Sequence, residues 1–182
     1  MLRTLQVLSL AFVGACAGTT KTPVGPDATP RCDGPAPPAR VEQRYHKAHD
    51  TTLVRLTPAP RPFCGADTAL VVAGSFKGRV ASMTPSELTI GLLARDRSFR
   101  LMHCTSLLIE ADESRIPVLA ERLPEIGRGG VLREYLLGPI PLLTFTRLME
   151  RQPLRISACG VTHKVRPDER AALVELLRQL EP

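Results

Sequence analysis

Short apolar segments with strand-like patterns follow one another closely from residue 51 to residue 109, and they constrain the fold more than any other part of the sequence. Residues 51–57 are rich in β-branched side chains, residues 69–73 are continuously apolar, and residues 88–92 alternate. Such patterns are typical of half-buried and fully buried strands. Further strands are predicted at residues 79–83, 99–104 and 107–109. Because little sequence remains between them for helices, we expect an antiparallel β-meander or a small curled, barrel-like sheet.

After residue 113 the apolar residues take helical spacing. An apolar stripe at i, i+3, i+4 and i+7 predicts a helix over residues 114–123. The stripe consists of Ile116, Leu119, Ala120 and Leu123. Residues 131–149 form the most apolar stretch after the leader, and Gly138, Pro139 and Pro141 interrupt it. This stretch predicts a buried, kinked pair of helical pieces; the alternative is an exposed apolar ridge that docks a partner or enters lipid.

The end of the chain predicts one strand and one helix. Residues 154–165 have a strand pattern, with Gly160 at a bulge or tight turn. Pro167 begins the last helix, and Asp168 and Glu169 lie in its first turn, where the helix dipole favours negative charge. Its buried stripe consists of Leu173, Leu176, Leu177 and Leu180. The predicted fold class is therefore α+β: a curled sheet followed by helices, a late strand and a C-terminal amphipathic helix.

Three segments of the strand-rich half resemble the strands of small OB-like β-barrels. They are Gly78-Arg79-Val80, Leu88-Thr89-Ile90 and residues 99–105. The resemblance covers residues 78–105 and implies a curled sheet in this region.

The first sixteen residues have the features of an export signal. Arg3 is the only charge there, and residues 5–13 are apolar except for Gln6 and Ser9. This segment is shorter than the ~20 apolar residues that a spanning helix needs. A short apolar core that ends in small residues is typical of a secretory signal peptide.

The residues that close this segment, Val13-Gly14-Ala15-Cys16, resemble the lipobox of bacterial lipoproteins. The resemblance implies that the Cys16 thiol is acylated, with chains such as palmitate, and that the leader is cut before Cys16. Because Ala17 and not aspartate follows, it also implies the outer membrane, and the face, toward the periplasm or away from it, stays open. Ala15-Cys16-Ala17 also fits ordinary A-x-A cleavage, which would leave the protein soluble. The predicted organisation is a signal peptide (1–15), a lipidated Pro/Gly/Thr-rich tether (16–40) and a single α+β domain (41–182).

The chain has five cysteines, and four remain for disulfide bonds if Cys16 carries lipid. The other four are Cys32, Cys64, Cys104 and Cys159. In an exported chain an even remainder indicates two disulfides, and three pairings are possible. We expect Cys32–Cys64 and Cys104–Cys159. A redox role is the alternative, although the sequence contains no C-x-x-C spacing.

The composition argues against nucleic-acid binding. The net charge of +6 becomes +5 when Arg3 leaves with the leader, because residues 1–15 carry no other charge. This modest basic balance favours anionic surfaces without specifying a partner. Aromatic residues make up 4% and tryptophan is absent, whereas single-strand binders rely on aromatic stacking. No Lys/Arg-rich run of motif length occurs either.

Four histidines are the remaining candidates for chemistry. His46 and His49, beside Asp50, could lie on one side of a helical turn and offer metal ligands, but no further ligand is close in sequence. His103 is predicted to lie half-buried beside Phe99 and Leu101. His163 follows Cys159 by four residues, about 13 Å apart along one strand, which is too far for a direct dyad.

No catalytic motif is present, so we predict neither catalytic residues, nor a metal site, nor a cofactor. The predicted function is a non-catalytic, lipid-anchored envelope module: a scaffold, adaptor or assembly accessory. Its expected partners are the membrane, through the lipid, and an envelope protein. The alternative is an envelope enzyme or metal-binding protein that uses His46, His49, His103 or His163, or a free cysteine.

Overall fold

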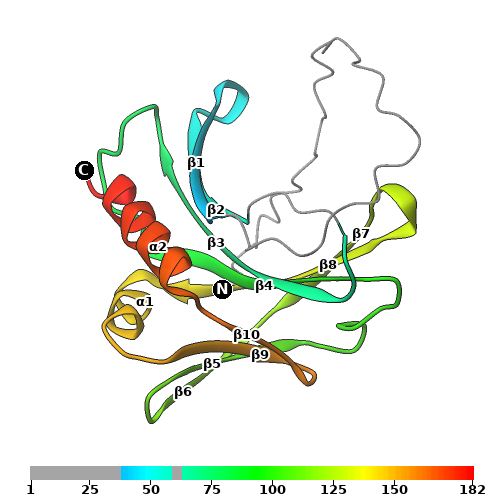
Figure 1. The fold of residues 1–182 in the computed structure, drawn as a ribbon. Helices are drawn as coiled ribbons and strands as arrows, with labels where there is room; N and C mark the ends of the chain where they lie inside the picture. The colour runs from blue at the N-terminus through cyan, green and yellow to red at the C-terminus, as the bar shows by residue number, and fades with distance from the viewer. Residues whose placement is uncertain (1–37, 59–62) are drawn as a thin grey trace, which may run out of the picture.

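Two antiparallel sheets and two helices make up the fold in Figure 1, a computed structural model that describes residues 38–58 and 63–182. The larger sheet has the order β1 (Arg40–His46), β2 (Thr51–Thr57), β3 (Asp67–Lys77), β4 (Glu87–Asp96), β8 (Leu132–Pro141) and β7 (Glu121–Ile126). The smaller sheet has the order β10 (Val161–Lys164), β9 (Leu154–Ala158), β5 (Ser106–Ala111) and β6 (Ser114–Leu119). The helices are α1 (Leu142–Met149) and α2 (Pro167–Leu180), with short 3-10 turns η1 (Lys47–His49) and η2 (Arg128–Gly130).

The predicted α+β class is confirmed, and the larger sheet is curled but not closed. Its strands β1 and β7 stand at opposite ends of the strand order and do not pair with each other. The strands from β1 to β4 follow one another as a meander; the sequence predicted β2, β3 and β4 of it and missed β1. The sheet is therefore an open, curved layer whose remaining faces must be covered by other elements.

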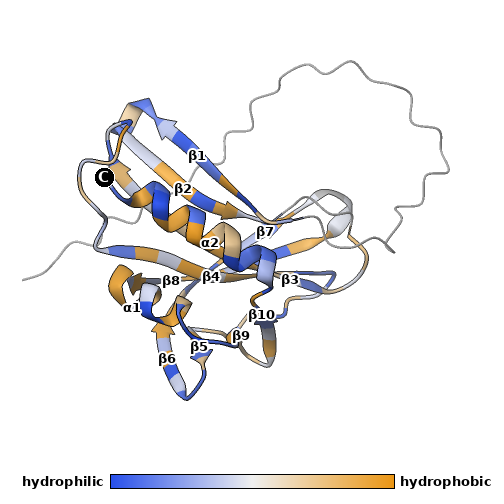
Figure 2. Cartoon of the chain, turned by 60° about the vertical axis from the view of Figure 1, so that its left-hand side comes forward, coloured by the Kyte–Doolittle hydropathy of each residue, from blue (hydrophilic) through white to orange (hydrophobic). Residues whose placement is uncertain are grey.

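One face of the larger sheet, here called the inner face, carries the core. Val54, Val72, Ile90 and Leu136 alternate with less buried residues along four neighbouring strands, and each is fully buried. Helix α2 packs against β1, β2 and β3, whereas the smaller sheet contacts β3, β4 and β8. Figure 2 shows apolar residues along α2 and in the strands behind it. The core is thus a sandwich, with α2 completing the layer over the first three strands.

Helix α2 begins and ends where the sequence predicted. Pro167 occupies its first turn, and the backbone N–H of Arg166, just before it, donates to the Glu169 carboxylate at 2.9 Å. Leu173, Leu176 and Leu180 are buried against the sheet. The stripe spacing, the N-terminal proline and the acidic first turn all favour the same helix, which explains why this prediction is confirmed.

The predicted helix over residues 114–123 is wrong: this segment forms β6 and the beginning of β7. Val118 is buried, while Leu119 is 82% exposed, so the apolar residues alternate as in a strand. Pro117 and Pro124 lie in β6 and β7, the edge strands of their respective sheets. Proline is tolerated at a sheet edge because the missing N–H faces away from the ladder.

The predicted pair of helical pieces in residues 131–149 is also wrong in its first half, which is strand β8. β8 is central, paired with both β4 and β7, and Leu136 and Ile140 point to the inner face. Gly138 gives the end of β6 room to pass over it, because a Cβ there would lie 2.3 Å from the Leu119 carbonyl oxygen. Only the second half is helical, as α1.

Three further strand predictions need correction. Residues 97–105 form a loop between β4 and β5, here called the β4–β5 loop, and His103 in it is exposed and not half-buried. Residues 79–83 are a loop after Gly78, whose φ is +84°, so the OB-like strand there is not formed. The predicted strand over residues 154–165 is a hairpin, β9–β10, with Gly160 at φ +80° in its turn.

Candidate functional site

The cysteines of the described residues are engaged in disulfides. Cys104 and Cys159 are joined, with their Cα atoms 6.0 Å apart, which confirms the predicted bond. Cys64 is disulfide-bonded as well. Cys16 and Cys32 lie outside the described residues, so lipidation and the Cys32–Cys64 pairing stay predictions. Cys104 and Cys159 are not available as thiols in this state.

The histidines are spread over the molecule. His46 ends β1, His49 lies in η1, and His103 is exposed on the β4–β5 loop. Within residues 38–58 and 63–182, no three or more His, Cys, Asp or Glu side chains come together in a way that could hold a metal ion. Nor is any helix in those ranges long and apolar enough to cross a membrane.

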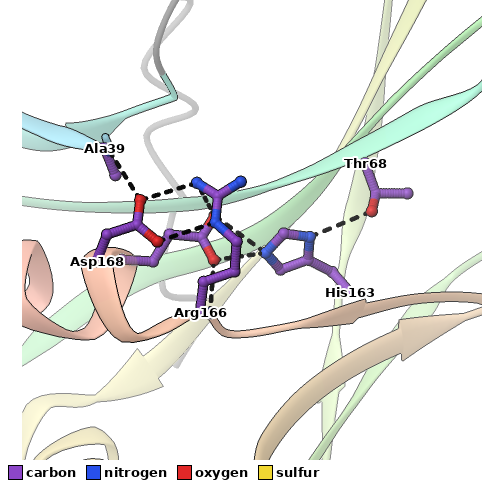
Figure 3. A network of polar contacts seen from close by, with 6 residues as sticks. Ala39, Thr68, His163, Arg166 and Asp168 are labelled. Atoms are coloured by element: carbon purple, nitrogen blue, oxygen red, sulfur yellow. Dashed lines mark hydrogen bonds and ion pairs between the residues drawn. The ribbon is translucent and has the colours of Figure 1, made fainter. Parts of the chain in front are cut away.

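His163 is the histidine that the fold brings into a polar network (Figure 3). It lies on β10 with 7% of its surface exposed. Its Nε2 lies 2.9 Å from a carboxylate oxygen of Glu169 on α2, and its Nδ1 lies 3.2 Å from the Thr68 hydroxyl on β3. One imidazole therefore connects the smaller sheet, the larger sheet and the helix.

Glu169 is the anionic centre of this network. Burial raises its pKa, but hydrogen bonds from the His163 ring and the Arg166 backbone, together with the Arg166 charge, outweigh that effect and hold the pKa below its ordinary value. An ionised carboxylate only accepts hydrogen bonds, so Nε2 of His163 carries the proton. In the neutral imidazole, Nδ1 is then the acceptor for the Thr68 hydroxyl.

The network extends to the start of the domain. Arg166 donates to Asp168 at 3.0 Å, and the Ala39 backbone N–H donates to the same carboxylate at 3.2 Å. Figure 3 shows Ala39, at the start of the described chain, beside the N-terminus of α2. Burial raises the pKa of Asp168, but the Arg166 and Ala39 hydrogen bonds outweigh this and lower it. The segment that precedes β1 is thereby fixed to the helix.

Thr68, His163 and Glu169 are the residue types that serve as nucleophile, general base and orienting carboxylate in hydrolytic enzymes, and they contact one another in that order. Thr68 also lines a pocket of about 430 Å³, together with Asp67, Arg100 and Thr162. Sequence reasoning named His163 but missed Thr68, which lies 95 residues away, and the contact with Glu169. The only available signal was the acidic first turn of α2, which was assigned to the helix dipole alone.

A second buried carboxylate organises the β4–β5 loop. Glu134 of β8 is buried, and it accepts hydrogen bonds from the backbone N–H groups of Arg100 and Leu101 and from the Arg122 side chain. Leu101 is fully buried, and Cys104 holds the end of the loop through its disulfide. The loop is therefore fastened at three points, although it has no regular secondary structure.

On its outer side the same loop exposes apolar side chains. Phe99 is 43% and Met102 is 47% exposed. The Arg122 guanidinium lies 5.4 Å from the centre of the Phe99 ring, within the range of a cation–π contact. Arg97, Arg100 and His103 are exposed around them.

A pocket of about 400 Å³ lies at the end of the larger sheet, on the face opposite the core. Arg95 and Arg133 line it, and they pair with Asp67 and Glu125 respectively. Nearby, burial raises the pKa of Tyr135 and Glu125 adds to the rise, while Arg133 and Arg55 oppose it. These charges largely compensate one another, so the pocket presents no unbalanced charge to a ligand.

No protein family model, no curated protein and no solved structure matches this chain.

Proposed function

We propose that the protein is a lipid-anchored module of the bacterial envelope, held through acylated Cys16 and without catalytic activity. Its role would be that of a scaffold, adaptor or assembly accessory, most consistent with the outer membrane because Ala17 follows the cysteine. The observation that carries the proposal is the sequence Val13-Gly14-Ala15-Cys16 directly after a short apolar leader. Several acyl chains would hold the domain stably, whereas one chain binds only marginally.

The geometry supports a non-catalytic role because the candidate catalytic groups have structural partners. Both ring nitrogens of His163 are engaged, and the ring is buried between β3 and α2. Cys104 and Cys159 are bonded to each other. A cysteine nucleophile would require this bond to be reduced first, and the His163 contacts already have a structural use, because they join β10 to β3 and α2.

Replacing the anchoring cysteine tests the proposal. We expect Cys16→Ala to leave the protein unprocessed or to move it into the soluble fraction, because the thiol that receives the lipid is gone. Cell fractionation and mass spectrometry of the N-terminal peptide are the measurements. Ala17→Ser, which keeps the four-residue motif, is the matched control and should stay acylated and membrane-bound. An unmodified native N-terminus would refute the anchor.

A hydrolytic function is the second candidate, and one observation favours it: the Thr68 hydroxyl contacts His163, and Thr68 is one of the residues that line a pocket. A fluorophosphonate probe should then label Thr68 in the wild-type protein and fail to label a His163→Gln variant. Absence of labelling in a folded wild-type protein would exclude Thr68 as a nucleophile toward this probe class.

A further inference from the structure

We propose that the β4–β5 loop is a second membrane contact, with Phe99 and Met102 entering the interfacial region of an anionic bilayer. This inference rests on the proposed function, since a lipid anchor brings the domain to the membrane. It adds an orientation: the end of the larger sheet where β3 begins and β4 ends would face the lipid.

The exposure of the two apolar side chains is enforced by the loop's anchors. Phe99 is the only exposed aromatic residue in the part of the chain that the structure describes. Its neighbour Leu101 is fully buried, and Glu134 accepts the two backbone N–H groups between Phe99 and Met102. A loop fixed in this way cannot turn Phe99 inward without losing these contacts. The exposed pair is therefore a stable property of the fold.

The charges around this pair suit an anionic surface. Three guanidinium groups, those of Arg97, Arg100 and Arg122, and the His103 imidazole belong to the loop or contact it. The two carboxylates in direct contact with them are Glu134, buried and paired with Arg122, and Asp96, bonded to Arg100, so the loop keeps a net charge of 3 − 2 = +1, carried by exposed Arg97. Apolar side chains framed by arginine are the combination that interfacial membrane segments use.

The loop lies at the end of the molecule where the tether reaches the domain. Ala39 is bonded to Asp168 at the N-terminus of α2, and His163 joins that terminus to Thr68. Thr68 in turn lines the same pocket as Arg100 of the loop. From Cys16 to Ala39 the chain advances 39 − 16 = 23 residues. Fully extended, it spans at most roughly 80 Å, and the predicted Cys32–Cys64 bond would limit the free part to residues 16–32, at most roughly 55 Å; either length lets the loop reach the bilayer surface.

A bilayer fits this patch better than a protein partner does. Two side chains cover far less than the roughly 800 Å² that each partner buries in a stable protein interface. A shallow contact of this size is useful when a covalent anchor already supplies most of the membrane affinity. The loop would then set the orientation of the domain and contribute little to its retention.

The absence of tryptophan allows a direct test. Phe99→Trp and Met102→Trp each introduce a single fluorophore, and Val174→Trp, at a 58% exposed position on α2, is the control. The lipidated protein is reconstituted in vesicles of phosphatidylethanolamine and phosphatidylglycerol. We expect a blue-shifted emission and quenching by brominated lipids at positions 99 and 102 but not at 174, and weaker effects in phosphatidylcholine vesicles. Equal quenching at all three positions, or none at 99 and 102, would overturn the proposal.

This design can reject the lipid anchor and the loop contact independently of each other. If the Phe99→Trp protein floats with the vesicles while its tryptophan emission stays unshifted, the loop contact is rejected and the anchor stands. If the native N-terminus is unmodified, the same quenching measurement on Phe99→Trp protein held on the vesicles by an N-terminal His-tag and a nickel-chelating lipid still tests the loop. A benzophenone residue at position 99 that crosslinks to one envelope protein and not to lipid would overturn the membrane contact and assign the patch to a protein partner.

Discussion

At the scale of single residues, the two sheets come into close contact at Gly138. The inner face of β8 passes under the end of β6, and an added Cβ would lie 2.3 Å from the Leu119 carbonyl oxygen and 2.7 Å from Val118 Cγ1. A backbone oxygen cannot move aside as a side-chain end can. We therefore expect Gly138→Ala to lower the free energy of unfolding by about 1–3 kcal/mol, as overpacked sites do. Urea unfolding monitored by circular dichroism measures it.

Gly160 provides the control for this prediction. Gly160 lies in the tight β9–β10 turn, where its φ is +80°. A Cβ added to Gly160 would have no atom within 4 Å, so the turn restricts its backbone conformation and not its side-chain volume. Asparagine adopts positive φ more readily than other residues with a side chain. Gly160→Asn should therefore change stability much less than Gly138→Ala. Equal losses at the two sites would mean that crowding at Gly138 is not the cause.

At the scale of elements, the Cys104–Cys159 bond holds the β4–β5 loop against the β9–β10 turn. It closes a sequence separation of 55 residues, which in the chain-entropy model corresponds to about 4 kcal/mol. We expect the double variant Cys104→Ser with Cys159→Ser to lose about 2–4 kcal/mol in urea unfolding without reductant. Because Cys64 keeps its bond, this variant isolates one disulfide, whereas a reducing agent acts on both. An unchanged unfolding midpoint would show that this bond does not stabilise the fold.

The individual strands and helices show how much of the fold could be predicted from the sequence. Strands β2, β3, β4 and β5 and helix α2 were found because local pattern and final environment agree in each. β6 was misread because Ile116 and Leu119 have helical spacing by coincidence, although Leu119 points to solvent. β8 was misread because its place between β4 and β7, which makes it a strand, is decided by distant residues. Local patterns cannot report such pairing.

In the candidate site, too, the sequence predicted local features and missed contacts between distant residues. The Cys104–Cys159 bond could be proposed from cysteine parity, and His163 could be named as a possible functional residue. Its partners could not be found, because Thr68 is 95 residues away and meets it only after the two sheets pack. The β4–β5 loop was predicted as a strand, so its exposed Phe99 was assigned to a buried face. Phe99 is exposed because Glu134 holds the backbone of the loop, and Glu134 lies 34 residues from Arg100 in the sequence, so a local pattern could not reveal this contact.

At the scale of the whole molecule, the His163–Glu169 pair joins both sheets to α2, so the titration of Glu169 should affect global stability. The folded-state pKa of Glu169 lies below its ordinary value of 4.5. Its contribution is therefore complete above that value and is lost as pH falls through the folded-state pKa. We expect the urea midpoint to decrease between about pH 5 and pH 3, and Glu169→Gln to flatten this dependence while lowering stability at neutral pH by about 1–3 kcal/mol.

A carboxylate on the same helix supplies the control. The Arg178 side chain lowers the pKa of Glu175 to about 2, with Gln179 adding to the effect, but this group is solvent-exposed. Solvent screens such surface pairs, so their measured contribution to stability is small. Glu175→Gln should therefore leave both the neutral-pH stability and its dependence on acid nearly unchanged. If the two variants behaved alike, the acid sensitivity would arise from general charge repulsion, and the buried pair would not be what ties the two sheets to the helix.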